Sequence, residues 1–436
     1  MSAGGKVLRA LTGAALRKNL INSFFYFGAS IAQFIVAIVT QPIYSRYLAL
    51  EDFAIIGYFS AIQALLYSLF NMCLPYYYMA RYWRIENGES PEQNMSFILN
   101  FLNIANCVVA VISYFLVSAY FDAFNVTFPL MPFLGIVLAH LFIEKYKTYF
   151  LIECRARKNG LSFFLLSLLQ IVLNTAFSLY FVVTLKYGVT GRMSGMLVGV
   201  TVASGVALYL LLSSGKYKFS WKPDRRKIKA ALAYCLPLIV ASYAYYPLDN
   251  VDRLLLEREK NTSEYGYYSI ALTVAGFVST FFIAVYQSFE PDLYRYISQK
   301  NYRRYILFAG AYTVLLVVCA MLFIAFSAPV MSFLTSGRYT YSSEYANVFV
   351  IGIVFMQIGG FFEQLFTAFG ATHFVMWRNV ILGVLSTGIY YFAVKQYSFS
   401  GASAARVGVA VLYLLLGFVM FYFFRKKRVA QPAHTL

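Results

Sequence analysis

Apolar runs long enough to cross a lipid bilayer recur along the whole sequence, and they limit its fold more than any other feature. A transmembrane helix needs about 20 predominantly apolar residues. We expect spans near 20–44, 53–79, 95–120, 129–152, 160–184, 193–213, 231–250, 265–289, 305–329, 345–368, 376–394 and 403–424. The chain is therefore predicted to be an all-α, polytopic membrane protein of about 12 transmembrane helices.

The composition and the short loops exclude large domains outside the membrane. Hydrophobic residues make up 60% of the chain and charged residues only 12%, whereas an ordinary soluble domain has about 25% charged residues. No connection between spans is long enough to fold on its own. We predict an N-terminal six-helix bundle over 1–214, a cytoplasmic linker over 215–229, and a C-terminal six-helix bundle with a cytoplasmic tail over 230–436.

Lysine and arginine gather on one side of this topology. The net charge is +18, and most of the basic residues fall in the loops that share a side with the N-terminus. The opposite side holds only Arg46, Lys186, Arg192, Arg253, Arg258, Lys260, Arg338 and Lys395. By the positive-inside rule, both termini are predicted to be cytoplasmic. Topology and contact with membrane lipids account for the charge, so nucleic acid is not an expected partner.

Cysteine spacing and the N-terminal segment add two negative expectations. The five cysteines have no paired spacing, which predicts neither a disulfide framework nor a metal site. The N-terminal segment is polar and basic, and no small-residue cleavage site follows the first span. We therefore expect no cleaved signal peptide.

Two segments, 45–82 and 252–296, have the same order of features. Each joins the end of one span to a short acidic-aromatic loop, crosses a whole apolar span, and ends at a proline followed by Arg-Tyr. Six spans return the chain to the same side, so the two halves would form a parallel repeat related by a pseudo-twofold axis along the membrane normal. Duplicated bundles of this kind are typical of transporters with a central cavity between the halves.

Ionisable residues inside predicted spans are candidates for function, because they are expensive to bury in lipid. In the fourth span, His140, Glu144 and Lys147 share one helical face. They could face a central cavity. Alternatively, Glu144 and Lys147 could form a pair near the cytoplasmic end, with Lys147 reaching the headgroups and His140 serving in packing.

The seventh span carries Tyr246, Asp249 and Arg253 on one face, with Asp252 at its outer end. Pro247 should kink this helix just before Asp249, because proline removes a backbone hydrogen bond. A kink beside an acid suits a helix that moves or faces a ligand. The alternative is an Asp–Arg pair that anchors the end of the span.

The tenth span contains Glu363 shortly after a pair of glycines, and we expect its carboxylate to face a cavity. Arg378 and Arg406 begin or lie within the last two spans. They could line a basic cavity for an anionic head group, or extend to the membrane surface. The candidate substrate or coupling residues are thus Arg46, His140, Glu144, Lys147, Asp249, Asp252, Arg253, Glu363, Arg378 and Arg406.

The loop segments carry a family resemblance. Arg46, Leu48, Asp52 and Phe53 follow the pattern R-x-L-x-x-x-D/E-Y/F-G, with Ala54 in the glycine position. The segments 236–239, 252–255, 264–269 and 291–294 are similar to the second-half pattern of the same family. The chain resembles Wzx-type O-antigen flippases of the multidrug/oligosaccharidyl-lipid/polysaccharide exporter (MOP) superfamily.

This resemblance implies two six-helix bundles around a central cavity in the bacterial inner membrane. It implies a flippase, not an enzyme, that moves undecaprenyl-diphosphate-linked oligosaccharides to the outer leaflet for lipopolysaccharide or other surface polysaccharide by alternating access. Proton or sodium coupling is open, no other cofactor is expected, and a polysaccharide polymerase and glycosyltransferases are possible partners.

Other functions remain open from the sequence. The same superfamily includes small-molecule drug antiporters, which would need an acidic site in the first bundle. A membrane-embedded polymerase should have a long outer loop, and an acyltransferase a positioned acid–base pair. An assembly scaffold would leave the intramembrane charges unexplained.

Overall fold

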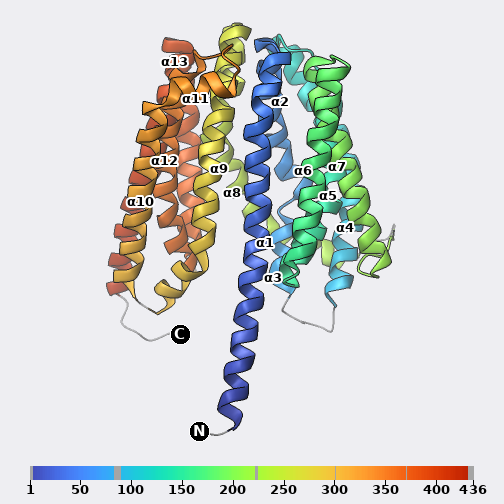
Figure 1. The fold of residues 1–436 in the computed structure, drawn as a ribbon, viewed down its shortest axis with the longest axis vertical. Helices are drawn as coiled ribbons and strands as arrows, with labels where there is room; N and C mark the ends of the chain where they lie inside the picture. Colours follow the sequence, from blue (N-terminus) through green and yellow to red (C-terminus); the bar gives the residue numbers. More distant parts are fainter. Residues whose placement is uncertain (1–2, 83–89, 221–223, 300, 370, 431–436) are drawn as a thin grey trace. The chain divides into compact units, whose positions relative to one another are not determined.

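The computed structural model describes residues 3–82, 90–220, 224–299, 301–369 and 371–430, and within them it is all-α, as predicted. The helices are α1 (Ala3–Tyr47), α2 (Leu50–Asn71), α3 (Leu74–Tyr82), α4 (Pro91–Phe124), α5 (Phe133–Ala156), α6 (Gly160–Leu179), η1 (Tyr180–Thr184), α7 (Gly188–Ser213), α8 (Arg225–Leu256), η2 (Glu257–Glu259), α9 (Thr262–Ser298), α10 (Tyr302–Ala325), α11 (Ser327–Leu334), α12 (Ser342–Ala368) and α13 (Thr372–Ala430). Figure 1 traces their order along the chain.

Ten of the described helices are long and apolar enough to span a membrane. Two further predicted spans bring the number to twelve. One coincides with α5, a helix of 24 residues that carries several charges. The other arises because α13 has 59 residues and contains two of the predicted spans. The chain is therefore a multi-pass membrane protein.

The prediction of one unbroken second span over 53–79 is wrong. Helix α2 ends at Asn71 and α3 begins at Leu74. Between them Met72 and Cys73 adopt positive φ angles of 48° and 52°, a conformation that interrupts a right-handed helix. Proline at the second position of α3 is compatible with this restart, because the first turn of a helix needs no donor there.

Helix α13 folds back on itself at Ser398, where φ is 50° and ψ is −129°. Arg378 precedes this break and Tyr413 follows it, yet their side chains are 2.7 Å apart. In a straight helix these residues would be about 50 Å apart, at 1.5 Å per residue. Gly401 permits the reversal, since a Cβ there would lie 2.0 Å from the Ala393 carbonyl oxygen.

Contacts divide the chain into two compact units that do not follow chain order. Unit 1 comprises Met1–Thr40, Leu66–Ala119 and Leu130–Pro237. Unit 2 comprises Gln41–Leu65, Tyr120–Pro129 and Leu238–Leu436. The end of α1 and most of α2 thus belong to unit 2. The predicted boundary of the two bundles at 215–229 stays a prediction, and 221–223 lie outside the described residues.

In unit 1, a row of small residues on α7 lets neighbouring helices approach closely. Gly191, Gly195, Gly199, Ala203 and Ala207 recur every fourth residue and are buried. A Cβ on Gly195 would lie 2.4 Å from the backbone of α6, and one on Gly199 would lie 2.5 Å from it. Rows of small residues are how helices pack tightly where lipid supplies no hydrophobic drive.

In unit 2, α12 packs against both α9 and α13. A buried cluster joins α8 to the two arms of α13, with Leu248, Leu382 and Val409 among its members. Tyr390 and Tyr413 belong to the same cluster. Tyrosines in this core bring hydroxyl groups into the interior, where they need hydrogen-bond partners.

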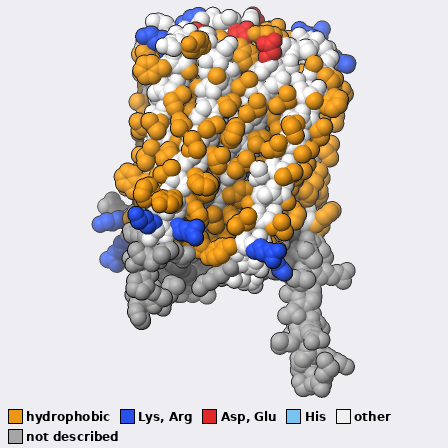
Figure 2. Space-filling model, turned by 90° about the vertical axis from the view of Figure 1, so that its left-hand side faces the viewer, with side chains coloured by type: hydrophobic (Ala, Val, Ile, Leu, Met, Phe, Trp, Pro, Cys, Tyr) orange, Lys and Arg blue, Asp and Glu red, His pale blue; other side chains and the backbone are white. Residues whose placement is uncertain are grey.

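The surface agrees with a membrane setting. Large hydrophobic side chains such as Phe115, Leu307, Val384 and Phe418 are more than half exposed. Figure 2 shows hydrophobic side chains over the face in view, with Lys and Arg confined to its two ends. Such an apolar surface belongs against lipid hydrocarbon.

Candidate functional site: buried charges in each helical unit

A buried acid–arginine pair lies at the end of unit 2 where α8 meets α9. The Asp252 carboxylate is fully buried. It accepts a hydrogen bond from Arg406 Nε at 2.8 Å and another from the Tyr268 hydroxyl at 2.5 Å. Arg406 also donates to the Asp249 carbonyl. The predicted Asp–Arg pair therefore exists, but its arginine comes from α13 and not from the adjacent position 253.

Arg253 instead binds α2. Its guanidinium donates to Ser60 Oγ at 2.6 Å and to Asn250 Oδ1 at 2.7 Å. About two turns earlier on α8, the Tyr246 hydroxyl donates to the Ala61 carbonyl at 3.2 Å. Tyr246 and Arg253 thus lie on one face, as predicted, and this face contacts α2 within unit 2.

Arg46 lies at the exposed end of α1, away from the buried pair. It donates to Ser336 Oγ at 3.1 Å, and Arg338 in turn donates to the Arg46 carbonyl at 2.7 Å. Asp52, from the same motif, accepts a hydrogen bond from the Ala49 backbone amide at 2.9 Å. The family-like loop at 45–54 is therefore a helix-connecting turn fixed by backbone and side-chain hydrogen bonds.

A second acid–arginine group joins α12 to both arms of α13. Arg378 is fully buried and donates to Glu363 Oε2 at 2.6 Å and to the Tyr413 hydroxyl at 2.7 Å. The Tyr413 hydroxyl lies 2.8 Å from the same carboxylate oxygen. Gly359 makes room for this ring, since a Cβ there would lie 2.4 Å from it. The Glu363 side chain is 43% exposed, so this group is open on one side.

Tyr245 of α8 and Tyr390 of α13 lie between these two groups. Tyr245 packs against the buried cluster that contains Tyr390 and Tyr413. The Tyr390 hydroxyl donates to the Leu248 carbonyl on α8 at 3.1 Å. The unit 2 polar track, as we name it, consists of Tyr245, Asp249, Asp252, Tyr268, Glu363, Arg378, Tyr390, Arg406 and Tyr413. It brings together five of the predicted site residues from three helices.

Helix α8 remains helical through Pro247. The helix is not interrupted at this position, and the kink expected there stays a prediction. Asp249, one turn beyond Tyr245, is partly buried. Its side chain interacts with the Tyr245 side chain.

In unit 1, the three predicted residues of α5 are in contact. Glu144 lies 2.8 Å from Lys147 Nζ and 3.5 Å from His140 Nε2. The carboxylate is 20% exposed and the lysine 9%. One acid therefore holds two potentially cationic groups inside a membrane helix.

Lys145, which the sequence analysis did not select, is the most unusual charge in unit 1. Its side chain is 2% exposed, and within the described part of the chain its ammonium has no hydrogen-bond partner. It lies 3.6 Å from the centre of the Phe142 ring, which gives a cation–π contact. The sequence signal was its position inside the fourth span, but periodicity put it on a different face from Glu144.

A row of buried amides on α4 was also missed. Asn100, Asn103 and Asn106 are spaced three residues apart and are all buried. The Tyr217 hydroxyl donates to Asn100 Oδ1 at 2.9 Å and accepts from Asn103 Nδ2 at 3.1 Å. Burial raises the pKa of Tyr217, outside the spans, to about 12. The repeated asparagines in the third span were the available signal.

The described residues contain no group of three His, Cys, Asp or Glu side chains that could hold a metal ion. The charged side chains described above instead form buried or partly buried ion pairs. Such pairs can exchange partners with an anionic or cationic ligand when a conformational change opens them. A charged ligand that replaces one partner of such a pair could bind inside the helical unit and later be released.

Comparison with known proteins identifies the family. A family model described as "Polysaccharide biosynthesis protein" matches residues 20–291. No curated protein sequence matches the chain significantly.

Solved structures show the fold. The Lipid II flippase MurJ, in an inward closed conformation, has 14% identity and a TM-score of 0.72, over 92% of this chain and 87% of that chain. An inward-facing multidrug resistance MATE family transporter of the MOP superfamily has 14% identity and a TM-score of 0.65, over 91% and 94%. A variant of the Vibrio cholerae MATE transporter VcmN has 13% identity and a TM-score of 0.60, over 96% and 98%. Because the family model covers more than half of its length, the chain belongs to the polysaccharide biosynthesis protein family.

Proposed function

We propose that this protein is a flippase that moves oligosaccharides linked to undecaprenyl diphosphate from the cytoplasmic to the outer leaflet, by alternating access, for O-antigen or related surface polysaccharide. The oligosaccharide and the diphosphate are too polar to cross hydrocarbon unaided. A protein path must therefore replace their hydration, while the lipid tail stays in the bilayer.

The observation that carries this proposal is the set of buried cations within the membrane helices. Arg378 and Arg406 in unit 2 and Lys145 and Lys147 in unit 1 are all well shielded from solvent. Arginine binds phosphate oxygens with paired hydrogen bonds, and lysine binds them as a point charge. The buried arginines are held by acids in the structure, so a diphosphate would compete with those acids for them.

Coupling to protons or sodium ions belongs to the same proposal. The Glu363 side chain is 43% exposed, and Asp249, another acid of the unit 2 polar track, is partly buried. Binding of a cation to either acid would release its partners and change the packing of α8 against α13. Asp249→Asn and Glu363→Gln variants with normal rate and ion dependence would contradict this role.

The orientation in the membrane and the neighbouring enzymes are part of the same proposal. Both termini would be cytoplasmic in a bacterial inner membrane, as the distribution of Lys and Arg favours. The protein would work beside the glycosyltransferases that build the lipid-linked unit and the polymerase that consumes it.

The direct test is deletion of the gene, followed by analysis of surface polysaccharide and of lipid-linked sugars. We expect surface polysaccharide to be lost and lipid-linked units to accumulate on the cytoplasmic side. A wild-type copy should reverse both effects, and a copy with Arg378→Gln should reverse them poorly. Normal surface polysaccharide in the deletion strain would overturn the proposal.

The main alternative is an antiporter of small cationic drugs, which the MATE-like fold supports. The TM-score is higher for the Lipid II flippase than for the two MATE transporters quoted above, and buried arginines suit an anionic cargo better than a cationic one. Drug accumulation assays in the same deletion strain separate the two functions. A polymerase or acyltransferase activity would appear instead as altered chain length or acylation of the polysaccharide.

A further inference from the structure

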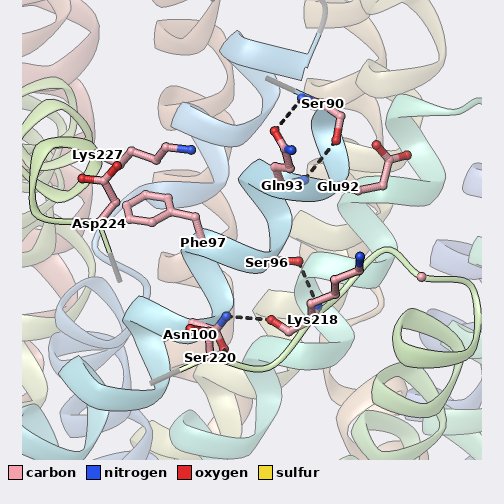
Figure 3. A pocket seen from close by; sticks show the side chains of 11 residues that line it. Ser90, Glu92, Gln93, Ser96, Phe97, Asn100, Lys218, Ser220, Asp224 and Lys227 are labelled. Carbon is pink, nitrogen blue, oxygen red and sulfur yellow. Dashed lines mark hydrogen bonds between the residues drawn. The ribbon is translucent and has the colours of Figure 1, made fainter. Parts of the chain in front are cut away.

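A polar pocket of about 440 Å³ lies in unit 1, between the start of α4 and the segment that joins α7 to α8 (Figure 3). Its volume is within the range of small-ligand sites. The lining residues are Ser90, Glu92, Gln93, Ser96, Phe97, Asn100, Gly215, Lys218, Ser220, Asp224 and Lys227. This pocket is separate from the buried charges of α5 and from the unit 2 polar track.

The pocket lies beside the ends of three helices that are long and apolar enough to span a membrane. Three membrane-spanning segments of unit 1 end or begin beside it, at Pro91 of α4, Ser213 of α7 and Arg226 of α8. Pocket residues lie within a few positions of each of these span ends. The headgroup zone flanks the hydrocarbon core at the ends of membrane spans, so we expect the pocket to be reached by phospholipid headgroups.

Hydrogen bonds hold one wall of the pocket in place. The Lys218 backbone amide donates to Ser96 Oγ at 2.9 Å, and Asn100 Nδ2 donates to the Lys218 carbonyl at 2.8 Å. The Ser220 amide donates to Asn100 Oδ1 at 3.0 Å. The connecting segment is thus fastened to α4, which lowers the entropy that a ligand would lose on binding.

The described lining residues carry charges of both signs. Lys218 and Lys227 supply two ammonium groups and Asp224 supplies a carboxylate, whereas the Glu92 carboxylate is already paired with Arg157 at 2.6 Å. In Figure 3, Lys227 and Asp224 lie on one side of Phe97 and Lys218 lies on the other. A dianion would meet repulsion as well as attraction here. A ligand with one phosphate and one ammonium matches both kinds of group.

Two helix ends lie beside the pocket and are capped by its own residues. Gln93 N donates to Ser90 Oγ at 3.3 Å at the start of α4, and the Arg226 amide donates to Asp224 at 2.8 Å at the start of α8. These caps hold the Ser90 and Asp224 side chains in place at the pocket. Phe97, which is largely buried, offers an apolar contact for the glycerol end of a lipid.

We propose that this pocket binds the headgroup of a zwitterionic phospholipid with a primary amine, of the phosphatidylethanolamine type. Its phosphate is bound by Lys218 and Lys227, and its ammonium group faces Asp224. The bound lipid bridges α4 and α8 and stabilises unit 1 at its membrane surface.

The test uses the purified full-length protein in detergent, with native mass spectrometry and thermal unfolding in the presence of defined lipids. Wild type should bind phosphatidylethanolamine more tightly than phosphatidylglycerol, which lacks the amine, or phosphatidylcholine, whose quaternary amine cannot donate. Lys227→Gln should weaken phosphatidylethanolamine binding about fivefold, as expected for loss of about 1 kcal/mol at a solvent-accessible charge. Asp224→Asn should remove the preference over phosphatidylglycerol.

Lys229→Gln is the matched control, because Lys229 lies on the same helix but is exposed and outside the pocket. It should leave lipid binding unchanged. Equal binding of phosphatidylethanolamine and phosphatidylglycerol by wild type would overturn the proposal. So would equal losses in the Lys227 and Lys229 variants, or displacement of the lipid by inorganic phosphate as readily as by phosphoethanolamine, which would indicate a simple anion site.

Discussion

The Asp252–Arg406 pair allows a quantitative test of how unit 2 is stabilised. The carboxylate is fully buried and the arginine is 16% exposed. Replacing Asp252 by leucine leaves Arg406 with only the Asp249 carbonyl as a hydrogen-bond acceptor among the described contacts. Replacing Arg406 by leucine leaves a buried carboxylate with only the Tyr268 hydroxyl as a donor. Each single change therefore creates an uncompensated charge in the interior of unit 2.

The expected loss is about 3–5 kcal/mol for each single variant, which is the usual penalty for breaking one half of a buried ion pair. The double variant, with leucine at both positions, removes both charges and restores an apolar contact. It should be closer to wild type than either single variant, because replacing a buried pair by apolar residues is often neutral. Strong non-additivity of this kind is what a direct pair predicts.

Unfolding of the four proteins in mixed micelles, followed by far-ultraviolet circular dichroism as denaturing detergent is added, measures these free energies. Lys260→Gln is the control. Its ammonium is 42% exposed and lies 3.2 Å from Glu257, which also accepts two hydrogen bonds from Thr127 at 2.7 Å. We expect it to lose less than about 1 kcal/mol. Additive single losses, or losses no larger than the control, would refute the argument.

Three other changes follow from individual contacts. Lys145→Met should raise the free energy of unfolding by about 1–3 kcal/mol, because it removes a buried ammonium without a hydrogen-bond partner among the described residues. A simultaneous fall in flipping activity would indicate that the charge is kept for function. A lower free energy of unfolding would contradict the reasoning. Gly195→Ala should destabilise unit 1 by about 1–3 kcal/mol through overpacking against α6, whereas Gly205→Ala, with open space at its Cβ, should be neutral or slightly stabilising in the same unfolding assay. Glu363→Gln should slow substrate flipping in proteoliposomes and reduce its dependence on the ion gradient, and an unchanged gradient dependence would exclude Glu363 from coupling.

The helices themselves were predictable from the sequence because hydrophobicity along the chain is a local property. Each of the twelve predicted runs is mostly helical, and the all-α class follows from them. The break after Asn71 was not predictable, because Met72 and Cys73 are ordinary helix residues that adopt positive φ only in the folded chain. The reversal at Ser398 was easier to predict, since polar and small residues there separate two apolar runs.

The candidate site was predictable as a set of residues but not as a set of pairs. Rarity of charge in the spans selected Asp252, Glu363, Arg378 and Arg406 correctly as buried or partly buried groups. The same reasoning suggested an Asp–Arg pair within one span, whereas the structure pairs residues 154 positions apart. Lys145 was passed over because helical periodicity alone does not tell which face of a helix meets its neighbours.

The sequence alone determined the all-helical class, the number of spans and the short list of charges within them, because lipid imposes a length and a polarity that each segment must satisfy by itself. The tertiary structure decided which acid meets which arginine, how α1 and α2 divide between the units, and that the start of α4 and the α7–α8 connection enclose a pocket. These features depend on contacts between residues far apart in the chain. Such contacts are fixed by the packing of whole helices, on which composition and periodicity carry no information.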